Sequence, residues 1–259
     1  MREEDVAVAV AGLDSPIDDS GARYGTGMST AYRISADLAV LAEDRRAAWR
    51  LVESFAADWS PRPLGPGDGC DDASLDEAEQ RLGMKLPVAL REAYGLLGRR
   101  DDLARNHDTL LRPDALFTYE GALVYHVENQ GAANWGIMLS DLGYDDPPTV
   151  CRPDLADKVS ESWDPWTDRL STALVELVMT ETVKHEDDGL SDACEPPEGA
   201  LDAFQALPSV LPERFGSRWY LGDQVILHCL EDWWLTVRAR TPEPLESVRE
   251  AVHGDWING

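Results

Sequence analysis

Residues 118–141 read TYEGALVYHVENQGAANWGIMLSD, and this stretch decides the fold of the chain. Its apolar residues fall at near-alternate positions in two runs, separated by a polar tip at Asn129, Gln130 and Gly131. Period-two alternation around a glycine-bearing connection predicts two antiparallel strands with one buried face. That face is predicted to present Leu123, Tyr125 and Val127 from the first run, and Trp135, Ile137 and Leu139 from the second.

A second strand-rich region lies near the C-terminus. Gly222-Asp223 and Glu231-Asp232 are short connections between apolar runs, and such connections favour tight hairpins. Thr241-Pro242 then fits the start of a last helix. The predicted strands of this meander are Arg218–Leu221, Gln224–Leu230 and Trp233–Ala239.

The other periodic segments are helical. One amphipathic helix is predicted from Ser35 to Trp59. Ser74 and Glu77 fit a capping box at the start of a second helix, and Gly83 fits the residue that ends it. A further helix is predicted from about Asp168 to Val183, with Thr167 as its N-cap. Together the elements predict an α+β fold, a mainly antiparallel sheet packed by several helices.

The segments between these elements suggest how the chain is organised. Residues 1–34 mix acids, Gly, Ser and small residues without a sustained period, so we expect a flexible leader. Residues 35–259 are predicted to form a single domain. Within it, residues 184–203 (KHEDDGLSDACEPPEGALDA) are acidic and bear Pro and Gly, and they are predicted to form an exposed loop.

Charge is the strongest feature of the composition. The chain has 259 residues, with 23 Lys plus Arg against 49 Asp plus Glu, and its formal net charge is −26. Phosphate backbones and membrane surfaces are anionic, so this charge argues against nucleic-acid and membrane partners. The acidity either serves solubility alone or steers association with a basic partner, and composition leaves both explanations open. With short apolar runs and an acidic start, we expect a cytoplasmic protein.

The sequence lacks the usual catalytic and metal-binding patterns. It has no G-x-S-x-G, H-E-x-x-H, Walker-type or G-x-G-x-x-G motif, and its four cysteines form no C-x-x-C pair. The histidines lack the clustered or i, i+4 partners typical of metal ligands. Glu128, Asn129 and Gln130 lie near His126, but local turn chemistry explains them better than acid–base catalysis. We therefore expect no enzyme, no catalytic residue, no cofactor and no metal.

Three features, in this order, resemble the SMI1/KNR4 family, also called the SUKH superfamily. SLDEAEQRLGMKLPVALREAYGLLG (Ser74–Gly98) is similar to the family's E-x-x-L-G-hydrophobic-x-L-P motif. ENQGAANWGI (Glu128–Ile137) is similar to its E-N-Q-G followed by W-x-hydrophobic, and DDPPTV (Asp145–Val150) precedes a Trp-bearing loop and a helix. The resemblance covers residues 74–183, and the meander and helix over 217–253 fit the same domain. Its signature residues are Glu128, Asn129, Gln130, Gly131 and Trp135.

The resemblance implies an SMI1/KNR4-like α+β fold and a function through protein–protein contact, without a catalytic site. Many bacterial members look like immunity proteins, which bind and block a polymorphic or contact-dependent toxin. We expect such an immunity protein here, with a toxin partner of basic surface, such as a nuclease. The alternative is a regulatory or scaffold interaction protein without a toxin partner, like the fungal members. The residues expected to contact the partner are Glu186, Asp187, Asp188, Asp192, Glu195, Trp233 and Trp234.

Overall fold

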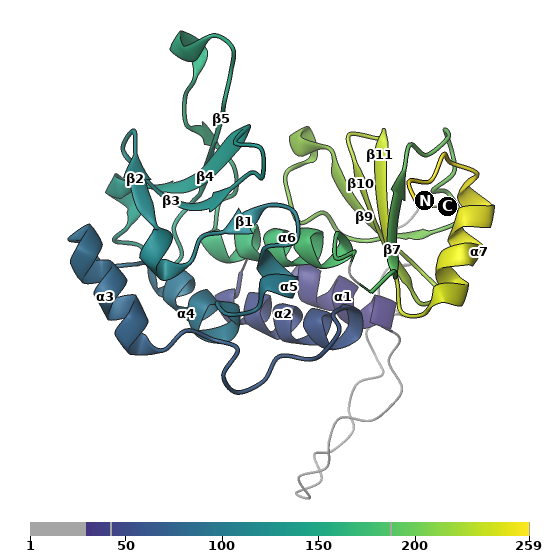
Figure 1. Ribbon diagram of the computed structural model, residues 1–259, viewed down its shortest axis with the longest axis horizontal. Helices are drawn as coiled ribbons and strands as arrows, with labels where there is room; N and C mark the ends of the chain where they lie inside the picture. The colour runs from purple at the N-terminus through teal and green to yellow at the C-terminus, as the bar shows by residue number, and fades with distance from the viewer. Residues whose placement is uncertain (1–29, 42, 187, 259) are drawn as a thin grey trace, which may run out of the picture.

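The computed structural model describes residues 30–41, 43–186 and 188–258. Two antiparallel sheets stand side by side above a layer of helices, and one more helix covers the outer side of the C-terminal sheet (Figure 1). The architecture confirms the predicted α+β fold, in which antiparallel strands are packed by helices.

The helical layer is built around one buried helix. The helices are α1 (Thr30–Ala39), α2 (Arg45–Trp59), α3 (Asp72–Leu82), α4 (Val88–Leu97), α5 (Asp101–Ala104), α6 (Leu170–Val183) and α7 (Pro242–Val252). Helix α6 packs against α2, α4 and α5, and it passes below both sheets (Figure 1). Its sequence, LSTALVELVMTETV, is apolar on nearly every side, as expected of a helix that is covered all round. Twelve of its 14 residues are buried.

The N-terminal sheet contains the predicted hairpin. Its strands run in the order β1-β3-β4-β5-β6, and β2 also pairs with β3. All the pairs are antiparallel, and β3 and β4 pair across the tip at residues 128–132 as predicted. The strands are β1 (Thr109–Leu110), β2 (Phe117–Tyr119), β3 (Ala122–Val127), β4 (Ala133–Met138), β5 (Val150–Pro153) and β6 (Asp164–Pro165), and 3-10 turns lie at Pro113–Ala115, Leu139–Asp141 and Lys158–Ser160.

The C-terminal sheet contains the predicted meander, and its order is β7-β11-β10-β9-β8. Residues with positive φ make its tight turns, Gln224 at 55° in one and Glu231 and Asp232 at 51° and 61° in the other. Its outer face packs against α7, and its inner face joins the main core. The strands are β7 (Ser191–Cys194), β8 (Gln205–Ala206), β9 (Ser217–Gly222), β10 (Val225–Leu230) and β11 (Trp234–Ala239), and a 3-10 turn at Glu213–Phe215 precedes β9.

Several predicted boundaries are wrong. The predicted helix from Ser35 to Trp59 is two helices, because the Asp44 side chain accepts a hydrogen bond from the Arg46 N–H and starts α2 anew. Residues 1–29 of the predicted leader lie outside the described residues, and α1 already begins at Thr30. The N-cap of α3 is Asp71 rather than Ser74, whereas Gly83 ends the helix as predicted, with φ at 70°. Arg169, not Thr167, occupies the N-cap position of α6, and its side chain makes no capping hydrogen bond.

The segment predicted as an exposed loop over residues 184–203 is partly a strand. Ser191–Cys194 forms β7, which pairs with the edge of β11. Asp192 and Ser191 are buried there. The acidic composition of the segment does not predict a strand, because the partner of the Asp192 carboxylate is Arg249 in α7, far along the chain.

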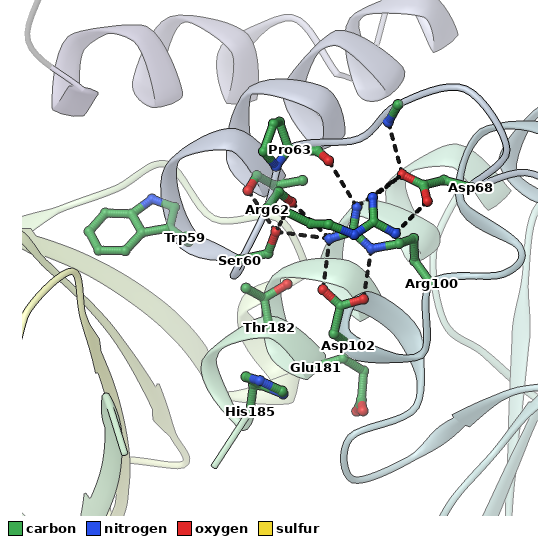
Figure 2. A network of polar contacts seen from close by, with 12 residues as sticks. Trp59, Ser60, Arg62, Pro63, Asp68, Arg100, Asp102, Glu181, Thr182 and His185 are labelled. Atoms are coloured by element: carbon green, nitrogen blue, oxygen red, sulfur yellow. Dashed lines mark hydrogen bonds and ion pairs between the residues drawn. The ribbon is translucent and has the colours of Figure 1, made fainter. Parts of the chain in front are cut away.

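A buried arginine holds the lower helices together (Figure 2). The Arg100 side chain is only 2% exposed, and its guanidinium donates to both carboxylate oxygens of Asp102 at 2.7 Å. It also donates to Asp68, to the Ser60 hydroxyl and to the backbone carbonyls of Arg62 and Pro63. This network ties the end of α2 to the start of α5.

Candidate functional site: an aromatic cleft between the two sheets

A cleft of about 310 Å³ is lined by side chains of both sheets and of α6. Figure 1 shows the two sheets side by side above α6. A cavity of this size is at the lower end of the range that ligand sites occupy. Both sheets, the turn before β9 and the loop after β6 contribute side chains to it. The lining includes Tyr125, His126, Trp135, Trp166, Ala173, Glu176, Leu177, Thr180, Glu181, Lys184, Leu211, Phe215, Ser217, His228, Leu230, Trp234 and Thr236, with His107, Asp108 and Glu128 at one end.

Aromatic rings form a continuous wall on the N-terminal side of the cleft. The Trp135 ring lies 4.2 Å from the His126 ring, stacked at 21°. Its other neighbour is Trp166, edge-on at 6.0 Å, and Trp166 in turn lies 4.0 Å from Phe215. All three of these apolar rings are half-buried, so part of their surface faces the cleft.

A bulge in β3 places His126 in this wall. Val124 pairs with Gly136 and His126 pairs with Trp135, so β3 has one extra residue, Tyr125, at this point. Without the extra residue, strict alternation would put His126 on the opposite face from Leu123. The bulge lets His126 as well as Tyr125 face the interior, whereas the alternation in the sequence predicted only Tyr125 there.

The His126 ring is neutral and has an unpaired nitrogen. His126 is 9% exposed, and its Nε2 has no hydrogen-bond partner within the described part of the chain. Burial, reinforced by the charge of Lys184, lowers its pKa to about 3. An unpaired buried nitrogen is uncommon in folded proteins, because such groups are costly to desolvate.

The C-terminal sheet repeats this stacked pair. His228 in β10 is paired in register with Trp219 in β9, and the two rings stack 4.3 Å apart at 15°. Burial also lowers the pKa of His228 to about 3. An interior strand of each sheet therefore presents a buried, neutral histidine beside a tryptophan, one on each side of the cleft.

Glu176 is the buried acid on the floor of the cleft. Its Oε1 accepts a hydrogen bond from the Ser217 hydroxyl at 2.6 Å, and its Oε2 accepts one from the Trp219 indole at 3.0 Å. Burial raises its pKa to about 7, and these two hydrogen bonds oppose the shift. Ser217 also lies 3.0 Å from Nε2 of His228. The hydroxyl, the imidazole and the carboxylate lie within contact distance, but both carboxylate oxygens are engaged in tying α6 to β9.

Two loops form the acidic end of the cleft. The Glu181 carboxylate in α6 accepts the backbone N–H groups of Asn106, His107 and Asp108 at 2.6, 2.7 and 3.0 Å. Glu128 holds the neighbouring hairpin tip, since its Oε2 accepts the N–H groups at residues 130 and 132 at 2.7 and 2.8 Å. The predicted turn role of this tip therefore falls mainly to Glu128, with Gly131 at a φ of 78°.

The same end brings together three groups that could hold a metal ion. Ligand atoms of His107, Asp108 and Glu128 lie within 4.8 Å of one another. Two of these side chains already accept backbone amides, Glu128 within its own tip and Asp108 from Asn129. Local sequence does not indicate this grouping, because the residues meet through the pairing of β1 with β3.

The residues that the sequence singled out for partner contact are dispersed. Trp234 is half-buried and lines the cleft, while Trp233 is 53% exposed in the turn before β11. Trp135 packs against the core as predicted and also lines the cleft. Glu186 and Glu195 are exposed, and Asp187 lies outside the described residues.

Two of the acidic residues that were expected to contact the partner protein bind arginines of this chain. Asp188 accepts a 2.6 Å hydrogen bond from the Arg238 guanidinium, which is almost fully buried. Asp192 is 3% exposed and accepts hydrogen bonds from the Arg249 Nε at 2.8 Å and from the backbone N–H of Asn258 at 3.1 Å. The prediction that Asp192 lies on an exposed contact surface is therefore wrong.

A second, more polar hollow of about 520 Å³ adjoins the cleft and shares His107, Lys184, Trp234 and Thr236 with it. Glu186, Asp192 and Trp234 line this hollow, so three residues of the predicted contact set lie in or next to the cleft.

Sequence reasoning missed Glu176, Ser217 and His228. The signal for Glu176 was a lone acid inside the apolar run TALVELVMT, because a charged residue in a fully buried helix needs a specific partner. His228 lies in the middle of an apolar strand, where a polar residue is equally out of place.

Comparison with protein-family models, curated proteins and solved structures finds no match for the chain. Among the described residues, no helix is both long enough and apolar enough to cross a membrane.

Proposed function

We propose that this chain is a non-enzymatic protein-binding module that receives a segment of its partner in the aromatic cleft. Its use in the cell is that of an immunity protein, which binds and neutralises a cognate toxin. The observation that carries the proposal is the cleft itself, since half-buried Trp135, Trp166 and Trp234 surround an open cavity between two sheets. Tryptophan is the residue type most enriched at binding hot spots.

The charge of the chain supports a basic partner. The formal net charge is −26, and Asp108 and Glu128 bring negative charge to one end of the cleft. A basic toxin, such as a nuclease with a cationic nucleic-acid site, would be attracted over long range and oriented before contact. The resemblance of Glu128–Ile137 and Ser74–Gly98 to SMI1/KNR4 proteins supports the same class of function.

Binding explains the buried polar groups better than catalysis does. A serine nucleophile needs a base that can take its proton, and burial keeps the His228 pKa near 3, far from neutral pH. The other neighbour of Ser217, Glu176, also accepts the Trp219 indole, and so it serves to fix β9 on α6. These contacts support a rigid wall for the cleft.

The test is co-expression with the product of the adjacent gene, followed by co-purification and by measurement of host survival. Thr180 lines the cleft from α6 and is half-buried, so Thr180→Phe fills the cavity from its floor. Thr172 is half-buried on the same helix but lines a different hollow, with Leu38 and Pro212, and Thr172→Phe is the matched control.

We expect the wild type and Thr172→Phe to co-purify with the toxin and to protect the host. Thr180→Phe should weaken binding by at least ~30-fold, the size of a hot-spot loss of about 2 kcal/mol. Absence of a complex and of protection with the wild type would refute the immunity function. Capture of a host protein in place of a toxin would favour the regulatory alternative.

A further inference from the structure

The charge that faces the cleft is mainly of one sign. Asp108, Glu128 and Glu176 line it. Among the described residues of its lining, Lys184 is the one lysine or arginine. Burial and the charge of Lys184 lower the pKa of His107, so its ring adds little positive charge at neutral pH. A concave surface with this balance raises the local concentration of cations.

The aromatic wall suits a flat cation. Rings of Trp, Tyr and Phe attract a guanidinium that lies over their face, and tryptophan does so most strongly. The chain already makes this contact beside the cleft, since the Arg214 guanidinium carbon lies 4.5 Å from the centroid of the Phe215 ring. Arg214 also donates a 2.9 Å hydrogen bond to the Pro165 carbonyl. A guanidinium of this chain, that of Arg214, therefore already packs on one ring of the wall.

The unpaired nitrogen of His126 points to a ligand that brings hydrogen-bond donors. In a neutral imidazole one ring nitrogen donates and the other accepts, so a tautomer with a bare Nε2 leaves an acceptor without a donor in a residue that lines the cleft. A guanidinium carries five N–H donors in a planar fork and no acceptor. It can therefore meet a neutral imidazole and a carboxylate at once, while its planar faces lie on the rings.

Building on the proposed function, we propose that the cleft receives an arginine side chain of the partner protein. The guanidinium would lie against the wall of Trp135 and Trp166, and donate to His126 and to the carboxylates of the cleft. A volume of about 310 Å³ gives room for an extended arginine side chain. Lysine fits less well, because its ammonium is a compact, strongly hydrated charge without a planar face.

The experiment uses the purified full chain and small peptide probes. Acetyl-Gly-Arg-Gly-amide is titrated by calorimetry against the same peptide with citrulline, which keeps the shape of arginine but carries no charge. A third peptide carries lysine. We expect the arginine peptide to bind about tenfold more tightly than either of the others, as a loss of about 1.4 kcal/mol would give. Equal binding of the arginine and citrulline peptides would overturn the proposal.

Variants locate the binding. Thr180→Phe should abolish binding of the arginine peptide, and Thr172→Phe should leave it unchanged. Glu128→Gln removes one charge at the end of the cleft while the amide oxygen can still accept the N–H groups of the tip, so binding should fall severalfold. Glu198→Gln, an exposed site that lines another hollow, should have no effect. Unchanged binding in both Thr180→Phe and Glu128→Gln would place the arginine elsewhere and refute the proposal.

The peptide titrations and the toxin co-purification test different claims. A partner that binds through the Thr180-sensitive cleft, combined with equal affinities for arginine and citrulline, would keep the protein-binding function and remove the arginine. Selective arginine binding without any captured toxin would keep the arginine site and refute the immunity function.

Discussion

Replacement of Arg100 by methionine tests how the lower layer of the fold is held (Figure 2). The side chain is 2% exposed and makes a two-bond contact with Asp102 at 2.7 Å, together with a contact to Asp68 at 3.2 Å. Methionine fills a similar volume but carries no charge. Asp102, whose side chain is 23% exposed, then loses its main partner, while Asp68 keeps Arg62.

The expected cost follows from what the variant leaves behind. Removing one partner of a buried ion pair typically costs about 3–5 kcal/mol, because the remaining charge stays buried without compensation. Two backbone carbonyls and the Ser60 hydroxyl also lose a donor. We therefore expect Arg100→Met to lower the free energy of unfolding by about 4 kcal/mol. Arg100→Lys should recover only part of this, since an ammonium cannot make the two-bond contact.

The neighbouring residue supplies the control. Arg99 is 49% exposed and pairs with Asp71, which is 59% exposed, at 2.9 Å. Exposed pairs contribute about 0–1 kcal/mol, so Arg99→Met should change the free energy of unfolding by less than ~1 kcal/mol. Urea denaturation followed by circular dichroism measures both variants. Equal losses in the two variants, or a loss of under ~1 kcal/mol for Arg100→Met, would contradict the account of the buried network.

Three further predictions concern buried ionisable groups. Burial lowers the pKa of His126 and His228 in the folded chain to about 3. Below pH 6.5 the unfolded chain therefore binds more protons, and the free energy of unfolding falls as pH falls from 6.5 toward 3. Urea midpoints should drop over this window, and they should drop less in the His126→Gln/His228→Gln double variant. Burial raises the folded pKa of Glu176 from 4.5 to about 7, so the folded chain binds more protons and stability falls as pH rises through that window, by about 3 kcal/mol. Glu176→Gln should therefore be more stable than the wild type at pH 8, and a less stable variant would contradict the burial argument. Asp192→Ala should lower the melting temperature strongly, because it removes the buried carboxylate that accepts hydrogen bonds from Arg249 in α7 and from the backbone N–H of Asn258, whereas Glu195→Ala at an exposed site should change it little; similar shifts would show that the Asp192 contacts add nothing.

Local periodicity predicted the strands better than the helix ends. The hairpin and the C-terminal meander follow from alternation and from short turns, both of which are local properties. The break near Asp44 was missed because the periodicity continues across it, while a single side-chain cap decides where α2 begins. Strand β7 was missed because the burial of Asp192 depends on Arg249, which local sequence does not reveal.

The site was harder to predict than the fold. Trp234 is predicted as a contact residue and Trp135 as a core residue, and both line the cleft. His126 is not predicted to line a site, because alternation gives no sign of the bulge at Tyr125 that turns it inward. Glu176 and its partners come from α6 and β9, and only the packing of the second sheet over that helix brings them together.

The central claim is that a partner occupies the cleft between the two sheets. The most direct measurement is the indole N–H spectrum of the 15N-labelled chain, which has nine tryptophans, recorded with and without the partner or the arginine peptide. Signals of Trp135, Trp166 and Trp234 should shift on binding, while Trp49, hydrogen-bonded to Glu92, and Trp256, at the C-terminal helix, should not. Shifts confined to Trp233 or Trp256, with the cleft signals unmoved, would place the binding surface elsewhere and contradict the claim.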